Sequence, residues 1–248
     1  MTDPFEASSR YYDLLYQEKD SAAEASYVDA LLRRHGIAGR ELLEFGSGTG
    51  RHGCLLAQQG YQVLGLERSA AMVAAAQQAP GFSCQQGDIT TTKLQRRFNA
   101  VLSLFHVVSY QTTNPAVQAV FANAAHHLDH GGLFLFDVWY SPAVASQRPV
   151  LRVKRLQSED FSITRIAEPK LHPNVNCVDV HYTVMAQERR TGLLHTFEET
   201  HPMRHFSLPE LDLLSEAAGF ERLTAEEWLT GALPSEATWG VCLVLCKK

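Results

Sequence analysis

Cysteine is scarce in this sequence, and its few copies form no closely spaced pair. The five cysteines are odd in number and include no C-x-x-C motif, which disfavours a disulfide framework and a structural zinc site. No apolar run approaches the roughly 20 residues of a membrane-spanning helix, and the first residues lack the basic and apolar regions of a signal peptide. We therefore expect free thiols, no metal, no membrane partner and a location in the cytoplasm.

The sequence also lacks any block of like charges. Its formal charge is −5 over 248 residues, and basic residues cluster only weakly, as at Arg33-Arg34, Arg96-Arg97 and around Lys154. Binding a nucleic acid would ordinarily require a stronger positive field, so we expect a small-molecule substrate and no nucleic acid. With 45% hydrophobic residues the chain can bury a large core, and a single domain with an insertion is expected.

A glycine-rich stretch from Glu41 to Gly53 organises the chain. It predicts a buried strand, a tight turn and a helix from about Arg51, so that backbone N–H groups and a helix N-terminus face a ligand. Gly48-Thr-Gly-Arg-His-Gly53 fits the dinucleotide fingerprint of an NAD(P) oxidoreductase. Glu44-Phe-Gly-Ser-Gly-Thr-Gly50 fits E/D-x-G-x-G-x-G, the first motif of class I S-adenosylmethionine (SAM) methyltransferases. The second pattern fits better, because a carboxylate at Glu44 suits the α-ammonium of methionine and would repel a pyrophosphate.

Acidic and aromatic side chains stand at the ends of the strands that follow. Glu67 ends the second expected strand, where a carboxylate can accept both ribose hydroxyls. Asp88 follows the third strand and could accept the exocyclic amine of adenine, with Ile89 against the ring, although Gly-Asp is also a common turn dipeptide. Phe105 and His106 end a fourth strand, expected over 98–106, and should line the cleft. A lone histidine is equally consistent with a structural role.

The pattern changes to alternation between residues 150 and 205. Half-exposed antiparallel strands are predicted there, with turns at Pro173-Asn174 and Thr191-Gly192. We expect residues 1–149 and 206–248 to form the ligand-binding core, with 1–36 as N-terminal lid helices. The insertion, residues 150–205, would cover the cleft and select the substrate.

Taken in order, these motifs resemble those of the class I SAM-dependent methyltransferases over nearly the full length. The resemblance implies a doubly wound, seven-stranded, mostly parallel sheet whose last strand is antiparallel, with SAM as cofactor and S-adenosylhomocysteine as product. Tyr11-Tyr-Asp-Leu-Leu-Tyr16 and the all-β insertion look more narrowly like the nucleotide-amino-sugar N,N-dimethyltransferases, and glycine N-methyltransferase relatives share some of these features. In the amino-sugar enzymes a tyrosine of this motif helps hold cofactor or substrate, which points to Tyr12 or Tyr16.

This reading assigns a role to each candidate residue. The catalytic candidates are His106 and Tyr12. The predicted cofactor-binding residues are Tyr16, Glu44, Gly46, Ser47, Gly48, Gly50, Glu67, Arg68, Asp88, Ile89, Leu104 and Phe105. The predicted substrate-binding residues are Tyr110, Trp139, Tyr140 and Arg204.

Three functions remain open from the sequence. The first is methyl transfer to the amine of a nucleotide-linked amino sugar, in which His106 could take the amine proton or only orient the group. The second is O-methylation of a small metabolite, and the third is a SAM-binding regulatory protein without catalysis. A monomer or a homodimer is expected in each case.

Overall fold

The computed structural model describes residues 11–16, 19–77 and 79–248, without the side chains of Tyr12 and Asp13. The first helices of the described residues are the short α1 (Tyr12–Leu15) and the longer α2 (Ser21–Arg34), which Asp20 caps by accepting a hydrogen bond from the Ala23 N–H. Within these ranges, no helix is both long and apolar enough to cross a membrane.

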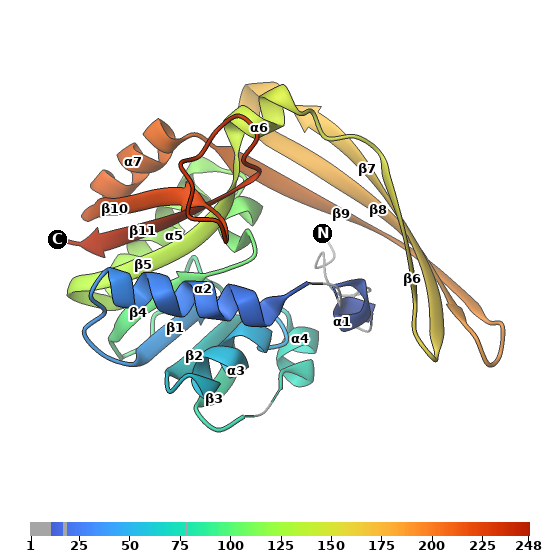
Figure 1. Cartoon of the computed structure of the whole chain (residues 1–248), viewed down its shortest axis with the longest axis horizontal. Helices are drawn as coiled ribbons and strands as arrows, with labels where there is room; N and C mark the ends of the chain where they lie inside the picture. Colours follow the sequence, from blue (N-terminus) through green and yellow to red (C-terminus); the bar gives the residue numbers. More distant parts are fainter. Residues whose placement is uncertain (1–10, 17–18, 78) are drawn as a thin grey trace.

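The central sheet has seven strands in the order β3-β2-β1-β4-β5-β11-β10. The first five are parallel, β11 is antiparallel to β5, and β10 is antiparallel to β11 at the edge (Figure 1). The strands are β1 (Glu41–Phe45), β2 (Gln62–Glu67), β3 (Phe82–Gln86), β4 (Phe98–Ser103), β5 (Leu128–Tyr140), β10 (Phe220–Glu227) and β11 (Gly240–Lys247). The predicted α/β sheet with an antiparallel last strand is confirmed.

Helices cover both faces of this sheet because successive strand residues point to opposite sides. Leu42 packs with Val28 of α2 and Leu56 of α3 on one face. Leu43 packs with Phe121 of α5 on the other face. The helices after α2 are α3 (Arg51–Gln58), α4 (Ala70–Ala75), α5 (Asn114–His126), α6 (Ser141–Ser146) and α7 (Leu208–Ala217), with short 3-10 turns η2 (Val107–Tyr110) and η3 (Pro173–Val175). The sheet is therefore doubly wound, as expected.

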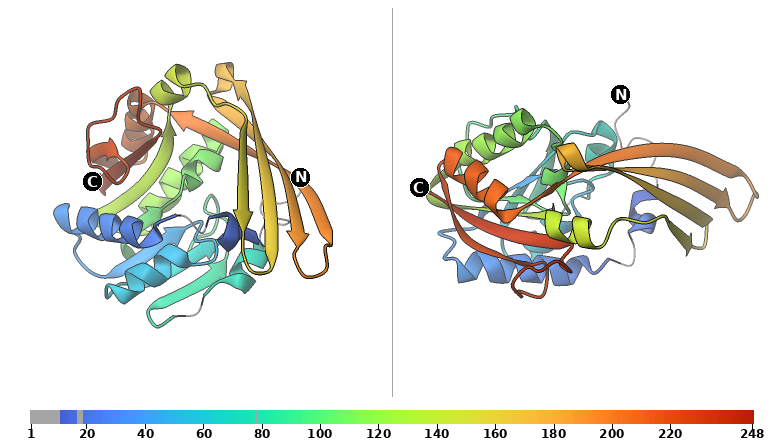
Figure 2. Two further views of the ribbon diagram at one scale, coloured as in Figure 1. Left: turned by 45° about the vertical axis from the view of Figure 1, so that its right-hand side comes forward. Right: turned by 90° about the horizontal axis from the view of Figure 1, so that it is seen from above.

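Four antiparallel strands form the insertion and extend beyond the core as a long curved blade (Figures 1 and 2). They are β6 (Arg152–Gln157), β7 (Phe161–His172), β8 (Cys177–Glu188) and β9 (Leu194–Phe206). The last residues of β9 pair in parallel with β5, through Trp139 with His205 and Tyr140 with Phe206. The blade and the core thus form one continuous 11-stranded sheet, and the expected boundary at residue 206 falls inside β9.

The N-terminal region divides between the two parts of the molecule. Tyr11 and Leu15 pack against Leu156, Ile163 and Val184 of the blade, whereas α2 packs on the core sheet. The structure therefore separates the expected lid of residues 1–36: the described part that contacts the blade is the α1 segment, and α2 belongs to the core.

Candidate active site

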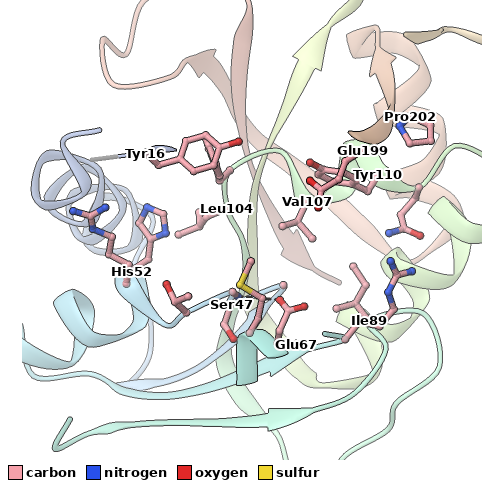
Figure 3. Close-up of a pocket in the computed structure, with 18 of the residues that line it drawn as sticks. Tyr16, Ser47, His52, Glu67, Ile89, Leu104, Val107, Tyr110, Glu199 and Pro202 are labelled. Carbon is pink, nitrogen blue, oxygen red and sulfur yellow. Dashed lines mark hydrogen bonds between the residues drawn. The ribbon is translucent and has the colours of Figure 1, made fainter. Parts of the chain in front are cut away.

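A cavity of about 990 Å³ lies where the carboxyl ends of the parallel strands face the blade. Its floor includes Ser47 after β1, Glu67 at the end of β2 and Ile89 after β3, and its opposite wall includes Glu199 and Pro202 of β9 (Figure 3). Ligands of open α/β sheets bind at this edge of the sheet. The cavity is large enough for two small molecules of metabolite size.

The glycine loop between β1 and α3 has the backbone geometry that its sequence predicts. Gly46, Gly48 and Gly50 have φ values of 69°, 55° and 79°, in the left-handed region that favours glycine. A Cβ on Gly46 would lie 2.6 Å from a methyl carbon of Val107, so a side chain has no room there. Gly46 and Gly48 line the cavity, and Gly50 instead caps α3 behind it.

Glu67 and Asp88, which are predicted to bind the cofactor, both line the cavity. The Gly48 N–H donates to Glu67 Oε2 and the Ser69 N–H donates to Oε1, each at 2.9 Å, so the carboxylate is fixed at the end of β2. Asp88 Oδ1 accepts from the Thr90 N–H at 2.7 Å, which fixes that side chain next to Ile89. Two oriented carboxylates in one cavity suit the hydroxyl and amine donors of a nucleoside.

Glu44 lies behind the cavity wall, with an exposed fraction of 1%. Burial raises the pKa of its carboxyl to about 7. His52 lines the cavity in front of it, with Nδ1 at 3.9 Å from Glu44 Oε1 and Nε2 at 2.7 Å from Glu24 Oε2. Lys19 Nζ lies 2.9 Å from the same Glu24 oxygen, and burial lowers the pKa of the Lys19 ammonium. Glu44 is thus not among the residues that line the cavity, and its contact with the cofactor stays a prediction. The sequence analysis did not identify this polar network.

The chain after β4 turns sharply, and this corrects the expected strand over 98–106. The strand ends at Ser103, and Phe105 and His106 have φ values of 63° and 62°, which are rare for such residues. Phe105 lines the cavity, with Lys19 Nζ 3.4 Å from its ring centroid. The His106 ring lies outside the set that lines the cavity, and its Nδ1 is 2.6 Å from Asp137 Oδ2.

Eleven of the predicted site residues line the cavity, and six described ones do not. Those that line it are Tyr16, Gly46, Ser47, Gly48, Glu67, Arg68, Asp88, Ile89, Leu104, Phe105 and Tyr110. Those that do not are Glu44, Gly50, His106, Trp139, Tyr140 and Arg204. The side chain of Tyr12 lies outside the described residues.

The three substrate candidates that do not line the cavity make contacts elsewhere in the structure. The ring of Trp139 packs edge-on against Trp239 with centroids 5.9 Å apart. Tyr140 precedes α6 as its N-cap residue. Arg204 is buried and donates to Asn114 Oδ1 at 2.8 Å and to Glu210 Oε1 at 2.5 Å, which joins β9 to α5 and α7. Strand-end position alone did not show which side chains turn away from the cleft.

The wall formed by the blade is strongly acidic, a feature that the sequence analysis missed. Asp179, Glu198 and Glu199 line the cavity. Each carboxylate has a histidine within 4.0 Å, namely His172, His181 and His201 in that order. Glu199 also bonds His201, which in turn bonds Tyr110. The two-residue spacing of Glu199 and His201 places them on one face of a strand, but their partner Tyr110 is 91 positions away from His201 in the sequence.

The strand order, the glycine loop and the acid at the end of β2 together define a class I SAM-dependent methyltransferase. The pattern of the family described as "Methyltransferase domain" matches residues 42–132. A dTDP-3-amino-3,4,6-trideoxy-alpha-D-glucopyranose N,N-dimethyltransferase of Streptomyces venezuelae is 30% identical over 211 residues, covering 84% of this chain and 87% of that protein. A dTDP-3-amino-3,6-dideoxy-alpha-D-glucopyranose N,N-dimethyltransferase of Streptomyces fradiae is also 30% identical, covering 84% and 81%.

Solved structures agree with these relatives. Streptomyces venezuelae DesVI has a TM-score of 0.82 at 25% identity, covering 97% of this chain and 98% of the other. The sugar N-methyltransferase KedS8 from Streptoalloteichus has a TM-score of 0.80 at 25% identity, covering 96% and 92%. The chain belongs to the family of SAM-dependent methyltransferases that contains these amino-sugar N,N-dimethyltransferases. It is an enzyme that uses SAM, and the dinucleotide interpretation of Gly48 to Gly53 is set aside.

Proposed function

We propose that this enzyme methylates the amine of a nucleotide-linked amino sugar. The observation that carries the proposal is the acidic wall of Asp179, Glu198 and Glu199 opposite the glycine loop. Such a wall attracts a cationic amine into the cavity, whereas an uncharged hydroxyl gains less from it. The substrates printed in the names of the relatives support the same class of acceptor.

The residues of the core fit SAM and suggest how it is held. Bound SAM supplies an electrophilic methyl group on a sulfonium. Glu67 would accept the ribose hydroxyls, and Asp88 with Ile89 would hold the adenine. Phe105 and Tyr16, whose ring centroids are 5.1 Å apart, would offer aromatic faces to the positive charge. The protein then has mainly to align donor and acceptor and to exclude water.

The blade and the α1 segment would together cover the cavity and select the acceptor. Tyr16 follows α1 and lines the cavity opposite Glu67 (Figure 3). The blade contributes residues of β8 and β9 to the other wall. The cytoplasmic location, the monomer or homodimer and the absence of a nucleic-acid partner stay predictions.

A direct assay tests the acceptor. The purified protein is incubated with SAM and with dTDP-3-amino-3,6-dideoxyglucose, and the products are analysed by mass spectrometry. We expect one and then two methyl groups on the sugar nitrogen. The matched 3-hydroxy sugar nucleotide is the control. Methylation of the hydroxy sugar alone would replace this proposal by O-methylation, and transfer to neither sugar would count against a nucleotide-sugar acceptor.

A further inference from the structure

Three side chains, Tyr110, His201 and Glu199, form a hydrogen-bonded chain along the wall of the cavity. Tyr110, at the end of η2, lies with its hydroxyl oxygen 2.9 Å from His201 Nδ1. His201 Nε2 lies 3.3 Å from Glu199 Oε2, and both residues belong to β9. Tyr110 and Glu199 line the same part of the cavity, across from His52 (Figure 3).

The donors and acceptors of this chain can be assigned from its two hydrogen bonds. The side chains of His201 and Glu199 are each only 7% exposed. In this assignment, His201 Nε2–H donates to the Glu199 carboxylate and the Tyr110 hydroxyl donates to His201 Nδ1. A hydroxyl oxygen that donates its proton is still an acceptor, and Tyr110 lines the cavity.

Neighbouring rings hold the imidazole in this orientation. The ring of Tyr182 lies edge-on to His201 at 5.1 Å between centroids, and the ring of Tyr110 lies at 5.8 Å. The backbone of His201 is paired with Val180 in the blade. A buried side chain locked by packing and by two hydrogen bonds is preorganised for proton transfer.

We propose that Tyr110, His201 and Glu199 form a proton relay that deprotonates the acceptor nitrogen. This inference rests on the proposed amine acceptor. Each methylation leaves a nitrogen with a positive charge and a proton, and its lone pair must be restored before a second methyl group can bind. The N–H bond breaks as that proton passes to the Tyr110 oxygen, and the original hydroxyl proton passes to His201 Nδ1. The resulting imidazolium is stabilised by Glu199 and later loses the proton to water.

The relay takes a role that the sequence analysis gave to His106. The ring of His106 is held against Asp137, and it is absent from the residues that line the cavity. Tyr110 lines the cavity and is the residue of the relay that would touch the amine. His201 acts through Tyr110 and is therefore a positioning and proton-accepting residue.

The tautomer of His201 can be tested without any acceptor. In nitrogen-15 NMR of the histidine-labelled protein, we expect a protonated Nε2 and an unprotonated Nδ1 on His201. The Tyr110→Phe variant should shift the Nδ1 resonance, because it loses its donor. The variant Tyr61→Phe is the control, since the Tyr61 hydroxyl donates to Asp29 and Tyr61 does not line the cavity. A proton on Nδ1 in the wild type would overturn the relay.

Kinetics test whether the relay matters for catalysis. With dTDP-3-amino-3,6-dideoxyglucose, Tyr110→Phe should lower kcat about 100-fold, as expected for loss of a general base, with the KM for the sugar nearly unchanged. The monomethylated sugar should accumulate, because the second transfer waits for deprotonation. Glu199→Gln should give a smaller loss of kcat, and the control Tyr61→Phe should behave as wild type.

The two experiments separate the relay from the proposed function. A folded Tyr110→Phe enzyme that forms the dimethylated sugar at the wild-type kcat would refute the relay and leave the acceptor assignment intact. If the Tyr110–His201 contact only joined η2 to β9, Tyr110→Phe would lower the melting temperature or raise KM. The monomethylated sugar would then not accumulate. If the wild type transfers no methyl group to this sugar, the acceptor assignment fails, and the tautomer measurement alone then decides the arrangement of the chain.

Discussion

Glu67 fixes the glycine loop and is the residue that we predict to bind the ribose. Its carboxylate holds the Gly48 and Ser69 N–H groups and also lines the cavity. Glu67→Gln keeps the size of the side chain and removes its charge and one acceptor. We expect S-adenosylhomocysteine to bind at least tenfold more weakly to this variant, a loss of about 1.4 kcal/mol, measured by isothermal titration calorimetry.

The control for this variant is Glu221→Gln, at an exposed position on the edge strand β10. The affinity of Glu221→Gln for S-adenosylhomocysteine should equal that of the wild type. Thermal unfolding of both variants shows whether the glycine loop has stayed intact. Wild-type affinity in a folded Glu67→Gln enzyme would refute the ribose assignment.

The burial of Glu44 predicts an unusual dependence of stability on pH. Burial raises the pKa of this carboxyl from 4.5 to about 7 in the folded protein, so between these values the folded state binds more protons than the unfolded state. The stabilisation is complete below pH 4.5 and is lost as the pH rises to about 7. At about 1.36 kcal/mol per pKa unit, the loss is on the order of 3 kcal/mol.

Glu44→Gln stays neutral at every pH and should not lose this stabilisation. Relative to the wild type, the variant should therefore become more stable between pH 5 and pH 8, which urea unfolding at the two values measures. Glu41→Gln is the control, because Glu41 lies on the same strand with a side chain that is 42% exposed. If the free energy of unfolding changed equally in the wild type and in Glu44→Gln, the buried carboxyl would be ionised over the whole range from pH 5 to pH 8, and the prediction would be wrong.

At the scale of elements, the sequence predicted regular segments well wherever a turn was encoded locally. The turns near Pro173 and Gly192 separate β7, β8 and β9 as expected. The strand expected over 98–106 was too long, because Leu104 and Phe105 continue its apolar pattern. The backbone turns there instead, and Asp137 accepts a hydrogen bond from the His106 N–H. Asp137 lies on β5, and no local pattern could reveal that contact.

The glycine loop shows why a motif can be read in two ways. Gly53 looks like the third glycine of a dinucleotide fingerprint, but its backbone has no need of a positive φ. A Cβ at Gly53 would lie 2.3 Å from the ring of Phe82, so the glycine serves the close packing of α3 on β3. The need for glycine at position 53 of α3 thus depends on Phe82, a residue of β3. The sequence motif therefore located the loop correctly and left its purpose ambiguous.

The acidic wall was missed for a related reason. The middle of β9 is polar on both faces, so the alternation of apolar and polar residues is lost between Glu198 and Thr200. The strand nevertheless continues there, because Glu199 and Thr200 pair with Tyr182 and His181 of β8. Polar residues in an exposed strand normally indicate that their side chains face the solvent. Here they face a cavity that exists only because the blade folds over the core, and the sequence does not encode that arrangement locally.

At the scale of the whole molecule, the α1 segment contacts both the blade and the cavity. The ring of Tyr11 is stacked on Phe197 of β9, with centroids 5.9 Å apart and planes at 11°. Leu15 is buried in the same cluster, and the next residue, Tyr16, lines the cavity. We therefore expect that weakening the contact between α1 and the blade lowers the affinity for the cofactor.

Phe197→Ala tests this coupling by removing the stacked ring while leaving the cavity wall intact. An aromatic pair contributes about 1 kcal/mol beyond burial, so the affinity for S-adenosylhomocysteine should fall about fivefold. Hydrogen exchange of residues 11–16 should become faster in the free variant, and the ligand should slow it less than in the wild type. Leu194→Ala is the control, since Leu194 is on the same strand and 57% exposed. Unchanged exchange in Phe197→Ala would mean that α1 holds its position through the core, and that the blade and the cofactor site act independently.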